Sequence, residues 1–315
     1  MKIAVFGGGG FIGSAICDRL LKKGHELRIF ERPRVEPYRR FSEKEVVEWM
    51  AGDFLSVHDV TTAIDGVDTV IHLISTTLPK SSNDDPVYDV QSNLVASLQL
   101  LNAMVKKNVK KIVFISSGGT VYGNPVYLPI DEKHPTDPLV SYGITKLAIE
   151  KYLLMYQHFH ELKTIILRVA NPYGERQRIE TAQGAVTVFA KKALFNEPIE
   201  IWGDGTVTRD YIYISDVAEA FVRAVDYDGE NSVFNISSGK GVNLNELISL
   251  IENILGRQVW CKYCGSRPFD VPVNVLDSSL AQQELGWQPR MALKEGLCRT
   301  IEWLQNSDKG SVLVR

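Results

Sequence analysis

Two side chains that could do acid–base chemistry together are those of Tyr142 and Lys146, which stand four positions apart. On a helix, residues four apart lie on the same side, so the phenol and the ammonium would face the same space. A free tyrosine has a pKa of about 10, and a neighbouring positive charge favours its phenolate form. Lowering that pKa by about three units corresponds to roughly 4 kcal/mol. The pair therefore predicts an acid–base group that works near neutral pH.

A glycine-rich segment near the start of the chain has the pattern of a phosphate-binding turn. Gly7, Gly10 and Gly13 lie between an apolar run and a helical pattern. In this setting the glycines permit a tight turn, a close approach of the backbone to a pyrophosphate, and close packing of helix against strand. The helix N-terminus adds free N–H groups and its positive dipole end. Glu31, at the end of the next apolar run, could bind ribose hydroxyls, so the segment predicts a dinucleotide site.

Glu31 also favours NAD over NADP as the cofactor, because its carboxylate would repel a 2′-phosphate. Arg32 and Arg34 follow it closely and could instead hold that phosphate, or they could be a solvated surface run. We therefore expect NAD, and a strong measured preference for NADP would contradict this.

The elements that position these residues follow an α/β order. Through the first half of the chain, short apolar runs alternate with helical patterns. Several runs are continuously apolar, as in strands that are buried on both faces of a parallel sheet. This order predicts a Rossmann-type, doubly wound parallel sheet with helices on both faces. We expect strands at 2–7, 26–30, 46–49, 69–74, 111–116 and 164–169, and helices at 12–23, 88–108 and 142–160.

Beyond Asn171 the pattern is less regular, and prolines and glycines mark turns. A helix at 216–226 and a strand at 232–237 are expected to return to the sheet, and a helix at 244–255 is expected to precede a loop-rich tail. This predicts a smaller, discontinuous C-terminal substrate lobe. The expected division is a dinucleotide-binding domain of residues 1–172, rejoined by about 212–237, and a lobe of residues 173–211 and 238–315.

The composition excludes several classes of protein. The chain has 315 residues, with 35 basic and 38 acidic residues and a formal charge of −3, so it is not a strongly basic nucleic-acid binder. We see no run of about 18 apolar residues, so no membrane span is expected. The apolar start is too short for a signal peptide, and four cysteines make no disulfide framework, so we expect a cytoplasmic protein. Cys261 and Cys264 lack a second pair at zinc spacing, so no metal is expected.

Taken together, these residues resemble the extended short-chain dehydrogenase/reductases of the NAD-dependent epimerase/dehydratase family. Within it the chain is most similar to nucleotide-sugar epimerases of the UDP-galactose (UDP-glucose) 4-epimerase type. The resemblance covers nearly the whole chain and rests on many motifs in one order. Besides the glycine pattern and the Tyr142–Lys146 pair, they are Gly52-Asp53, Ile71-His72-Leu73, Asn93, Ser116-Ser117, Val121-Tyr122-Gly123, Arg168-x-x-Asn171-Pro172-Tyr173-Gly174, Trp202-Gly203-Asp204-Gly205, Arg209-Asp210-Tyr211, Asp216-Val217-Ala218, Arg267-Pro268-x-Asp270 and Leu285-Gly286-Trp287.

The resemblance implies roles around the cofactor and the catalytic pair. Asp53 would contact the adenine, Asn93 would support the loop beside the cofactor, and Lys146 would also bind the nicotinamide ribose. Tyr142 and Lys146 would be catalytic, with Ser117 or Thr120 as a source of a further hydroxyl. The other residues implied in cofactor binding are Gly7, Gly10, Phe11, Ile12, Gly13, Glu31, Arg32, Phe54, Leu73, Ile74, Ser75 and Ser116.

The resemblance also implies a substrate site for a UDP- or dTDP-linked sugar. Asn171, Arg209 and Arg267 would bind the diphosphate, which suits planar arginine forks. Trp202 would pack against the nucleobase, and Asp270 would bind the nucleotide ribose. The alternative for Arg209 is a salt bridge with a nearby acid, Asp210 or Asp216.

One position departs from the family pattern. Where the epimerases usually carry a Ser or Thr that binds the sugar O4, this chain has Gly118. Ser117, Thr120 or a water could supply the hydroxyl, or the small residue could make room for a different sugar.

The leading hypothesis is an NAD-dependent 4-epimerase that works through a transient 4-keto sugar. The closest alternative is a dTDP-4-keto-6-deoxyhexose 4-reductase using NAD(P)H, and a second is a non-enzymatic dinucleotide-sensing protein. A 4,6-dehydratase is disfavoured because Gly119-Thr120 stands where that family usually carries an Asp-Glu pair. The family resemblance suggests a homodimer through the helices at 88–108 and 142–160.

Overall fold

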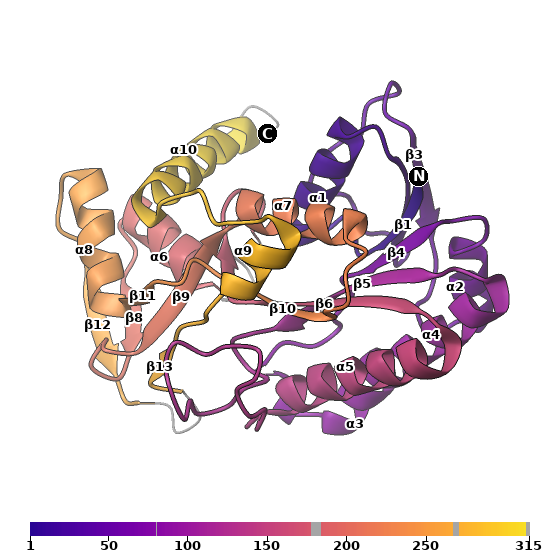
Figure 1. The fold of residues 1–315 in the computed structure, drawn as a ribbon. Coiled ribbons are helices and arrows are strands. Elements are labelled where there is room, and N and C mark those ends of the chain that lie inside the picture. Colours follow the sequence, from indigo (N-terminus) through magenta and orange to yellow (C-terminus); the bar gives the residue numbers. More distant parts are fainter. Residues whose placement is uncertain (80, 178–183, 267–270, 313–315) are drawn as a thin grey trace.

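The computed structural model describes residues 1–79, 81–177, 184–266 and 271–312. Its centre is a seven-stranded, all-parallel sheet with the strand order β10-β6-β5-β4-β1-β2-β3 (Figure 1). This confirms the predicted Rossmann-type sheet, including the late strand that returns to pair with β6. The strands are β1 (Lys2–Phe6), β2 (Glu26–Glu31), β3 (Val47–Ala51), β4 (Thr69–His72), β5 (Lys111–Ser117), β6 (Lys163–Val169) and β10 (Val233–Ile236).

Helices cover both faces of this sheet. One face carries α1 (Phe11–Lys22) and α7 (Ile214–Asp226), which pack against each other. The opposite face carries α2 (Val57–Ala63), α4 (Ala96–Lys107) and α5 (Ser141–His160) (Figure 1). The sequence patterns predicted these helices except α2, which is short.

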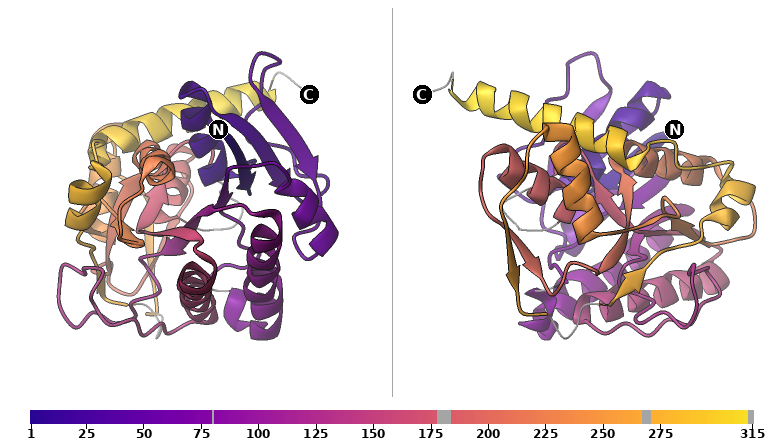
Figure 2. Two further views of the ribbon diagram at one scale, coloured as in Figure 1. Left: turned by 45° about the vertical axis from the view of Figure 1, so that its right-hand side comes forward. Right: turned by 90° about the vertical axis from the view of Figure 1, so that its left-hand side faces the viewer.

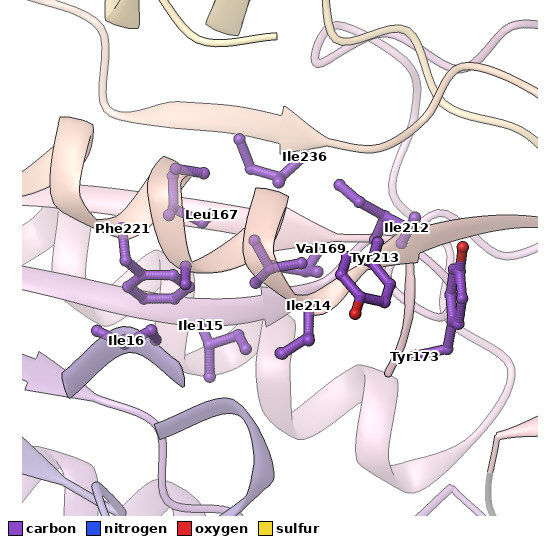
Figure 3. Close-up of a cluster of buried hydrophobic side chains, with 14 of the residues drawn as sticks. Ile16, Ile115, Leu167, Val169, Tyr173, Ile212, Tyr213, Ile214, Phe221 and Ile236 are labelled. Carbon is purple, nitrogen blue, oxygen red and sulfur yellow. The ribbon is translucent and has the colours of Figure 1, made fainter. Parts of the chain in front are cut away.

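The inner strands β1 and β4 are buried on both faces, whereas the edge strand β3 is largely exposed. In β1, Ile3 and Val5 join the core under α1 and α7, whereas Ala4 and Phe6 join the core on the other face. This alternation follows from the two-residue period of a strand. Figure 3 shows the first core, where Phe221 of α7 lies near side chains of the central strands.

The predicted helix at 88–108 is a composite. It consists of α3 (Pro86–Asp89), a π-helical segment η2 (Val90–Val95), and α4. A short 3-10 helix, η1 (Ser81–Asn83), precedes it. A π-helical turn inside a helix is uncommon and is frequently found at functional sites.

A smaller lobe follows the sixth strand. Two small sheets form it, one of β7 (Asn171–Tyr173), β9 (Thr208–Tyr213), β11 (Gly241–Asn243) and β13 (Val273–Asn274), and one of β8 (Ile199–Trp202) and β12 (Cys261–Cys264). Three helices pack on these sheets and on one another (Figure 2): α6 (Ala185–Leu194), α8 (Leu244–Leu255) and α10 (Leu293–Val312). The bounds of α8 match the prediction, and a capping box of Asn243 and Glu246 starts it.

The sequence patterns predicted no helix or strand beyond residue 255, so the prediction was incomplete there. Besides α10, the tail contains α9 (Ser279–Leu285), which contacts β10 and α7. The core under α7 also continues into the lobe through Tyr173, Ile212 and Tyr213, as Figure 3 shows. The lobe and the sheet therefore share one apolar cluster. In the described part of the chain, no helix is long and apolar enough to cross a membrane.

Candidate active site

A pocket of about 620 Å³ opens at the carboxyl ends of β1, β2 and β4. The strand order reverses between β1 and β4, and open α/β sheets bind ligands at such a reversal. Most residues predicted to bind the cofactor line this pocket. They are Gly7, Gly10, Phe11, Ile12, Gly13, Glu31, Arg32, Asp53, Phe54, Leu73, Ile74 and Ser75.

Sequence reasoning missed other residues that line the pocket. Two of them come from segments with no motif, Tyr38 after β2 and Gln177 from the lobe. The Tyr38 N–H donates to the Gly9 carbonyl at 3.0 Å, which brings this segment over the glycine turn. The remaining missed residues are Gly9, Phe30, Val35, Gly52, Leu55, Thr76, Leu78, Tyr88 and Ser92.

The glycine turn fits a dinucleotide pyrophosphate. Gly7 has a φ of 88°, a conformation that side chains disfavour. A Cβ on Gly13 would overlap the Gly7 carbonyl oxygen, so helix and strand approach closely only with glycine there. Gly10 caps α1 without a side-chain hydrogen bond, which leaves the N–H groups of the first turn for an anion. Glu31 Oε1 accepts the Gly9 N–H at 2.9 Å, which places this acid beside the turn.

The two predicted catalytic residues lie on α5 beside this pocket. Lys146 is buried, and its Nζ donates to the Ile115 carbonyl at 3.1 Å. That ammonium lies 5.7 Å from the centre of the Tyr142 ring and 4.8 Å from the Phe114 ring. Tyr142 is partly buried, and its hydroxyl faces Ser75, which lines the pocket. The structure thus brings the predicted acid–base pair to the edge of the pocket that the predicted cofactor residues line.

The expected fall in the pKa of Tyr142 is not produced by the protein groups. Burial raises the pKa of Tyr142 to about 12, the Ser75 side chain acts in the opposite direction, and the charge of Asp89 adds to the rise. Burial also lowers the pKa of Lys146 to about 8, against the influence of Asp89 and Glu150. The reason is that burial shields both groups from water, which disfavours the charged form of each. In addition, the ammonium binds a backbone carbonyl rather than the phenol.

The end of β5 and the turn that follows it contain three hydroxyl groups in different settings. Ser116 is buried and donates its hydroxyl to Glu150, so this hydroxyl is not presented to the cofactor as predicted. Ser117 is partly buried. Thr120 has a buried hydroxyl with no hydrogen-bond partner in the described part of the chain, so a ligand could complete it.

Gly118 lies against side chains from the far end of the sequence. A Cβ at this position would overlap the Leu276 side chain, and the Gly118 carbonyl accepts a hydrogen bond from Asn274 Nδ2 at 3.1 Å. Leu276 therefore occupies the space that a Ser or Thr would need. Asn274 Oδ1 is buried without a partner among the described residues. No sequence motif marked Asn274 or Leu276.

The residues predicted to bind the sugar nucleotide converge only in part. Asn171, on β7, has its Oδ1 next to Gly119, while its Nδ2 donates to the Asp210 carbonyl at 2.9 Å. Gly118, Thr120, Asn171, Asn274 and Leu276 are hereafter the Gly118 cluster.

Arg209 is held by backbone groups of the lobe. Its Nη1 donates to the Thr208 carbonyl at 2.9 Å and to the Val271 carbonyl at 2.6 Å. The acids considered as its salt-bridge partners bind other groups. Asp210 accepts from the N–H groups of Ser238 and Gly239 and from the Ser238 hydroxyl, and Asp216 accepts from the N–H groups of Arg290 and Met291.

Trp202 ends β8 at the surface of the lobe, where it is 38% exposed. Arg267 and Asp270, the other two predicted substrate residues, lie outside the described residues.

Known proteins identify the family. Residues 3–237 match the model of the NAD dependent epimerase/dehydratase family. The chain belongs to this family. As a member of it, the protein is an NAD-dependent enzyme of the extended short-chain dehydrogenase/reductase type.

Individual relatives of this epimerase/dehydratase carry two activities. The chain is 34% identical to a UDP-glucose 4-epimerase from Mycolicibacterium smegmatis, and the similarity covers 98% of this chain and 100% of that protein. It is also 33% identical to a dTDP-4-dehydro-6-deoxyglucose reductase from Escherichia coli, over 95% and 96% of the two chains.

Solved structures of epimerases superpose on the whole chain. The UDP-glucose 4-epimerase of Thermotoga maritima with UDP-glucose has a TM-score of 0.92 and 33% identity, covering 98% of this chain and 99% of that one. The UDP-glucose 4-epimerase of Thermus thermophilus in complex with NAD has a TM-score of 0.88 and 30% identity, covering 98% and 100%. These similarities support a nucleotide-sugar epimerase with NAD as its cofactor.

Proposed function

We propose that this protein is an NAD-dependent nucleotide-sugar 4-epimerase that acts on a UDP-linked hexose. The observation that carries the proposal is the position of Tyr142 and Lys146 on α5 at the edge of the dinucleotide pocket, with the Tyr142 hydroxyl facing Ser75, which lines it. Because the chain belongs to a family of enzymes and retains both residues, the dinucleotide-sensing alternative is set aside.

The protein's own residues would handle the proton and the orientation of the sugar. Tyr142 would take the proton from the C4 hydroxyl, and it would return that proton to the opposite epimer after the 4-keto sugar turns. Lys146 would bind the nicotinamide ribose, and the Thr120 or Ser117 hydroxyl would orient O4. The nicotinamide, when bound, supplies the hydride acceptor and a positive charge that favours the phenolate. That charge is needed because the protein groups raise the pKa of Tyr142.

We propose NAD rather than NADP on the position of Glu31. Its carboxylate lines the pocket and is fixed by the Gly9 N–H, so a 2′-phosphate on the adenosine ribose would meet a negative charge. Arg32 lines the same pocket and is the residue that would favour NADP. Measuring the affinities of the protein for NAD and for NADP tests which of these two residues determines the cofactor.

The proposed division of labour follows the predicted domains. Residues 1–172 with about 212–237 would bind the dinucleotide, and residues 173–211 and 238–315 would bind the sugar nucleotide. Asn171 and Arg209 are proposed to bind the diphosphate, and Trp202 the nucleobase. Arg267 and Asp270 keep their proposed roles on the family resemblance alone.

We also propose a homodimer that pairs α3, α4 and α5 with their copies. These helices carry a set of large apolar side chains at the surface, including Val87, Tyr152, Met155 and Phe159, of which Phe159 is 69% exposed. Apolar side chains gathered on one face are typical of an interaction surface. All four cysteines are unpaired, which suits the proposed cytoplasmic location.

The rival proposal is a 4-keto-sugar reductase, and the Gly118 cluster is the observation that favours it. The usual Ser or Thr is absent, Leu276 fills its space, and one relative carries the reductase activity. A reductase uses the same Tyr142–Lys146 pair but stops after one hydride transfer.

The two activities are distinguished by whether the reaction consumes a reduced cofactor. The purified protein is incubated with UDP-glucose, UDP-galactose, their N-acetylated forms and dTDP-4-keto-6-deoxyglucose, with no cofactor added, and products are resolved by chromatography. The epimerase proposal predicts interconversion of a 4-epimer pair with no net oxidation of cofactor. Turnover that occurs only with stoichiometric NAD(P)H would replace it with the reductase.

A further inference from the structure

The carboxylate of Asp89 is fully buried between the catalytic helix and the cofactor loop. It ends α3, immediately before the π-helical segment. Each of its oxygens accepts two side-chain hydrogen bonds. Oδ2 accepts from the Ser141 hydroxyl at 2.8 Å and from the Thr145 hydroxyl at 2.7 Å, and Oδ1 accepts from Asn93 Nδ2 at 3.0 Å and from the Thr77 hydroxyl.

The two donors to Oδ2 belong to the catalytic helix. Ser141 directly precedes Tyr142, and Thr145 directly precedes Lys146. Because the donors are one helical turn apart, a single oxygen that binds both fixes the rotation of α5 about its axis. The helix start is held from the same side, since the Ser82 hydroxyl accepts the Tyr142 N–H at 3.0 Å.

The two donors to Oδ1 belong to the cofactor side. Asn93 binds Asp89 through its amide N–H groups, and its Oδ1 accepts the Thr76 N–H at 2.9 Å. Thr76 and the neighbouring Ser75 line the dinucleotide pocket. The carboxylate of Asp89 therefore links the loop that lines the pocket to the helix that carries the acid–base pair.

The charges around Lys146 make Asp89 different from the other buried acid. Glu150 also faces Lys146, but Arg168 binds it at 2.6 Å in a buried ion pair. Asp89 has no Lys or Arg within ion-pair distance in the part of the chain that the structure describes. His72, on β4, is held neutral because burial lowers its pKa to about 3. Asp89 is thus the acid whose charge is not matched by a paired cation.

We propose that Asp89 is a positioning residue for the 4-epimerase reaction. Its carboxylate sets the rotation and distance of Tyr142 and Lys146 relative to the cofactor loop, and it provides a buried negative charge that faces both residues. The role in the reaction rests on the proposed function, whereas the position and the charge rest on the geometry alone.

A titration of Tyr142 tests the charge without any turnover. Tyrosinate absorbance is followed against pH in the protein as purified and in Asp89→Asn, each corrected by the same protein carrying Tyr142→Phe. Asp89 disfavours the phenolate, so its neutralisation is expected to lower the apparent pKa of Tyr142 by about one unit. Lys146 and Ser75 also face the phenol and are unchanged in both proteins. A difference below about 0.3 units would overturn the electrostatic part of the proposal.

A pre-steady-state measurement tests the positioning. Reduction of the bound nicotinamide by sugar nucleotide is expected to slow about tenfold to a hundredfold in Asp89→Asn, because small displacements of reacting groups cost rates of this order. Asp85→Asn is the matched control, since that carboxylate caps α3 from an exposed position and, among the described residues, accepts a hydrogen bond from the Tyr88 N–H alone. It is expected to react at the wild-type rate.

A second variant keeps the test independent of the folding of Asp89→Asn. The double variant Ser141→Ala/Thr145→Val retains the carboxylate but removes both helix contacts. It is expected to slow reduction about tenfold and to leave the Tyr142 titration unmoved. A rate within twofold of wild type would overturn the proposal. If the wild-type protein reduces no bound nicotinamide with any sugar nucleotide, the proposed function fails instead, and the titration still decides the charge of Asp89.

Discussion

The dinucleotide pocket and the Gly118 cluster both lie at the carboxyl ends of strands of the main sheet, but they are built in different ways. The pocket draws most of its lining from residues 7–13, 30–38, 52–55 and 73–78, which follow consecutive strands of one sheet. The Gly118 cluster joins three separate segments, and its Gly118 and Asn274 are 156 residues apart in the sequence. Backbone geometry dominates the first, and side-chain packing dominates the second. Chemistry common to a family can therefore stay fixed in the pocket while the sugar-facing side changes.

The largest expected effect comes from removing the proposed acid–base group, the hydroxyl of Tyr142. Tyr142→Phe keeps the ring but lacks the hydroxyl, so kcat is expected to fall about a thousandfold while the cofactor stays bound. Tyr127→Phe is the matched control, because that tyrosine is 43% exposed and belongs to neither region. Steady-state kinetics and the absorbance of retained nicotinamide measure both. A loss smaller than tenfold would mean that another group moves the proton.

Two glycine substitutions test the claim that backbone geometry dominates the pocket. In Gly13→Ala the new methyl group would overlap the Gly7 carbonyl, so we expect the free energy of unfolding to fall by about 1–3 kcal/mol and the cofactor to be lost. In Gly10→Ala the Cβ would lie 3.6 Å from the same oxygen, an ordinary contact, but at the surface that faces the ligand. This variant should lose cofactor affinity without losing stability. Equal stability of the two proteins, by denaturant unfolding without cofactor, would contradict the argument.

The same contrast explains which parts the sequence could predict. The glycine turn, the sheet and most of the pocket lining are encoded by contiguous motifs, because the turn chemistry and the two-sided burial of strands act over a few residues. The contact of Leu276 with Gly118 depends on how the tail crosses the sheet, which no local pattern specifies. The same holds for Tyr38 over the glycine turn, and for α10, which followed a tail expected to be loop-rich.

The pKa of Tyr142 was the other property that the sequence could not predict. The spacing of Tyr142 and Lys146 correctly placed both on one helix, but it implied a lowered pKa for the tyrosine. The protein groups alone raise it instead, because burial dominates and because Lys146 binds the Ile115 carbonyl. The pKa of Tyr142 depends on how deeply the phenol is buried and on charges such as that of Asp89, which is far from Tyr142 in the sequence.

Lys146 gives an intermediate effect and separates stability from activity. Burial lowers its pKa to about 8, so the ammonium destabilises the fold where it is charged, below that pH. The penalty fades as the pH rises toward the ordinary value of about 10.4, because the unfolded chain then also loses the proton. Lys146→Met should be inactive yet more stable than wild type by about 2 kcal/mol at pH 7, with a smaller gain at pH 9.5. Denaturant unfolding at the two pH values measures this, and a gain that grows with pH would refute it.

The smallest expected effect concerns the Gly118 cluster, where packing is predicted to dominate. Gly118→Ser restores the residue type of the family, but its Cβ would overlap Leu276, so the substitution alone should destabilise the protein by about 1–2 kcal/mol. Leu276→Ala also costs stability, since Leu276 is fully buried. In the double variant the serine occupies the vacated space. Its destabilisation should therefore be about 1 kcal/mol smaller than the sum of the two single-variant values. Gly265→Ser, with open space around its Cβ, is the control for adding the side chain. Strict additivity in the double-mutant cycle would show that Leu276 does not limit the residue at 118, and the glycine would then need a reason other than packing.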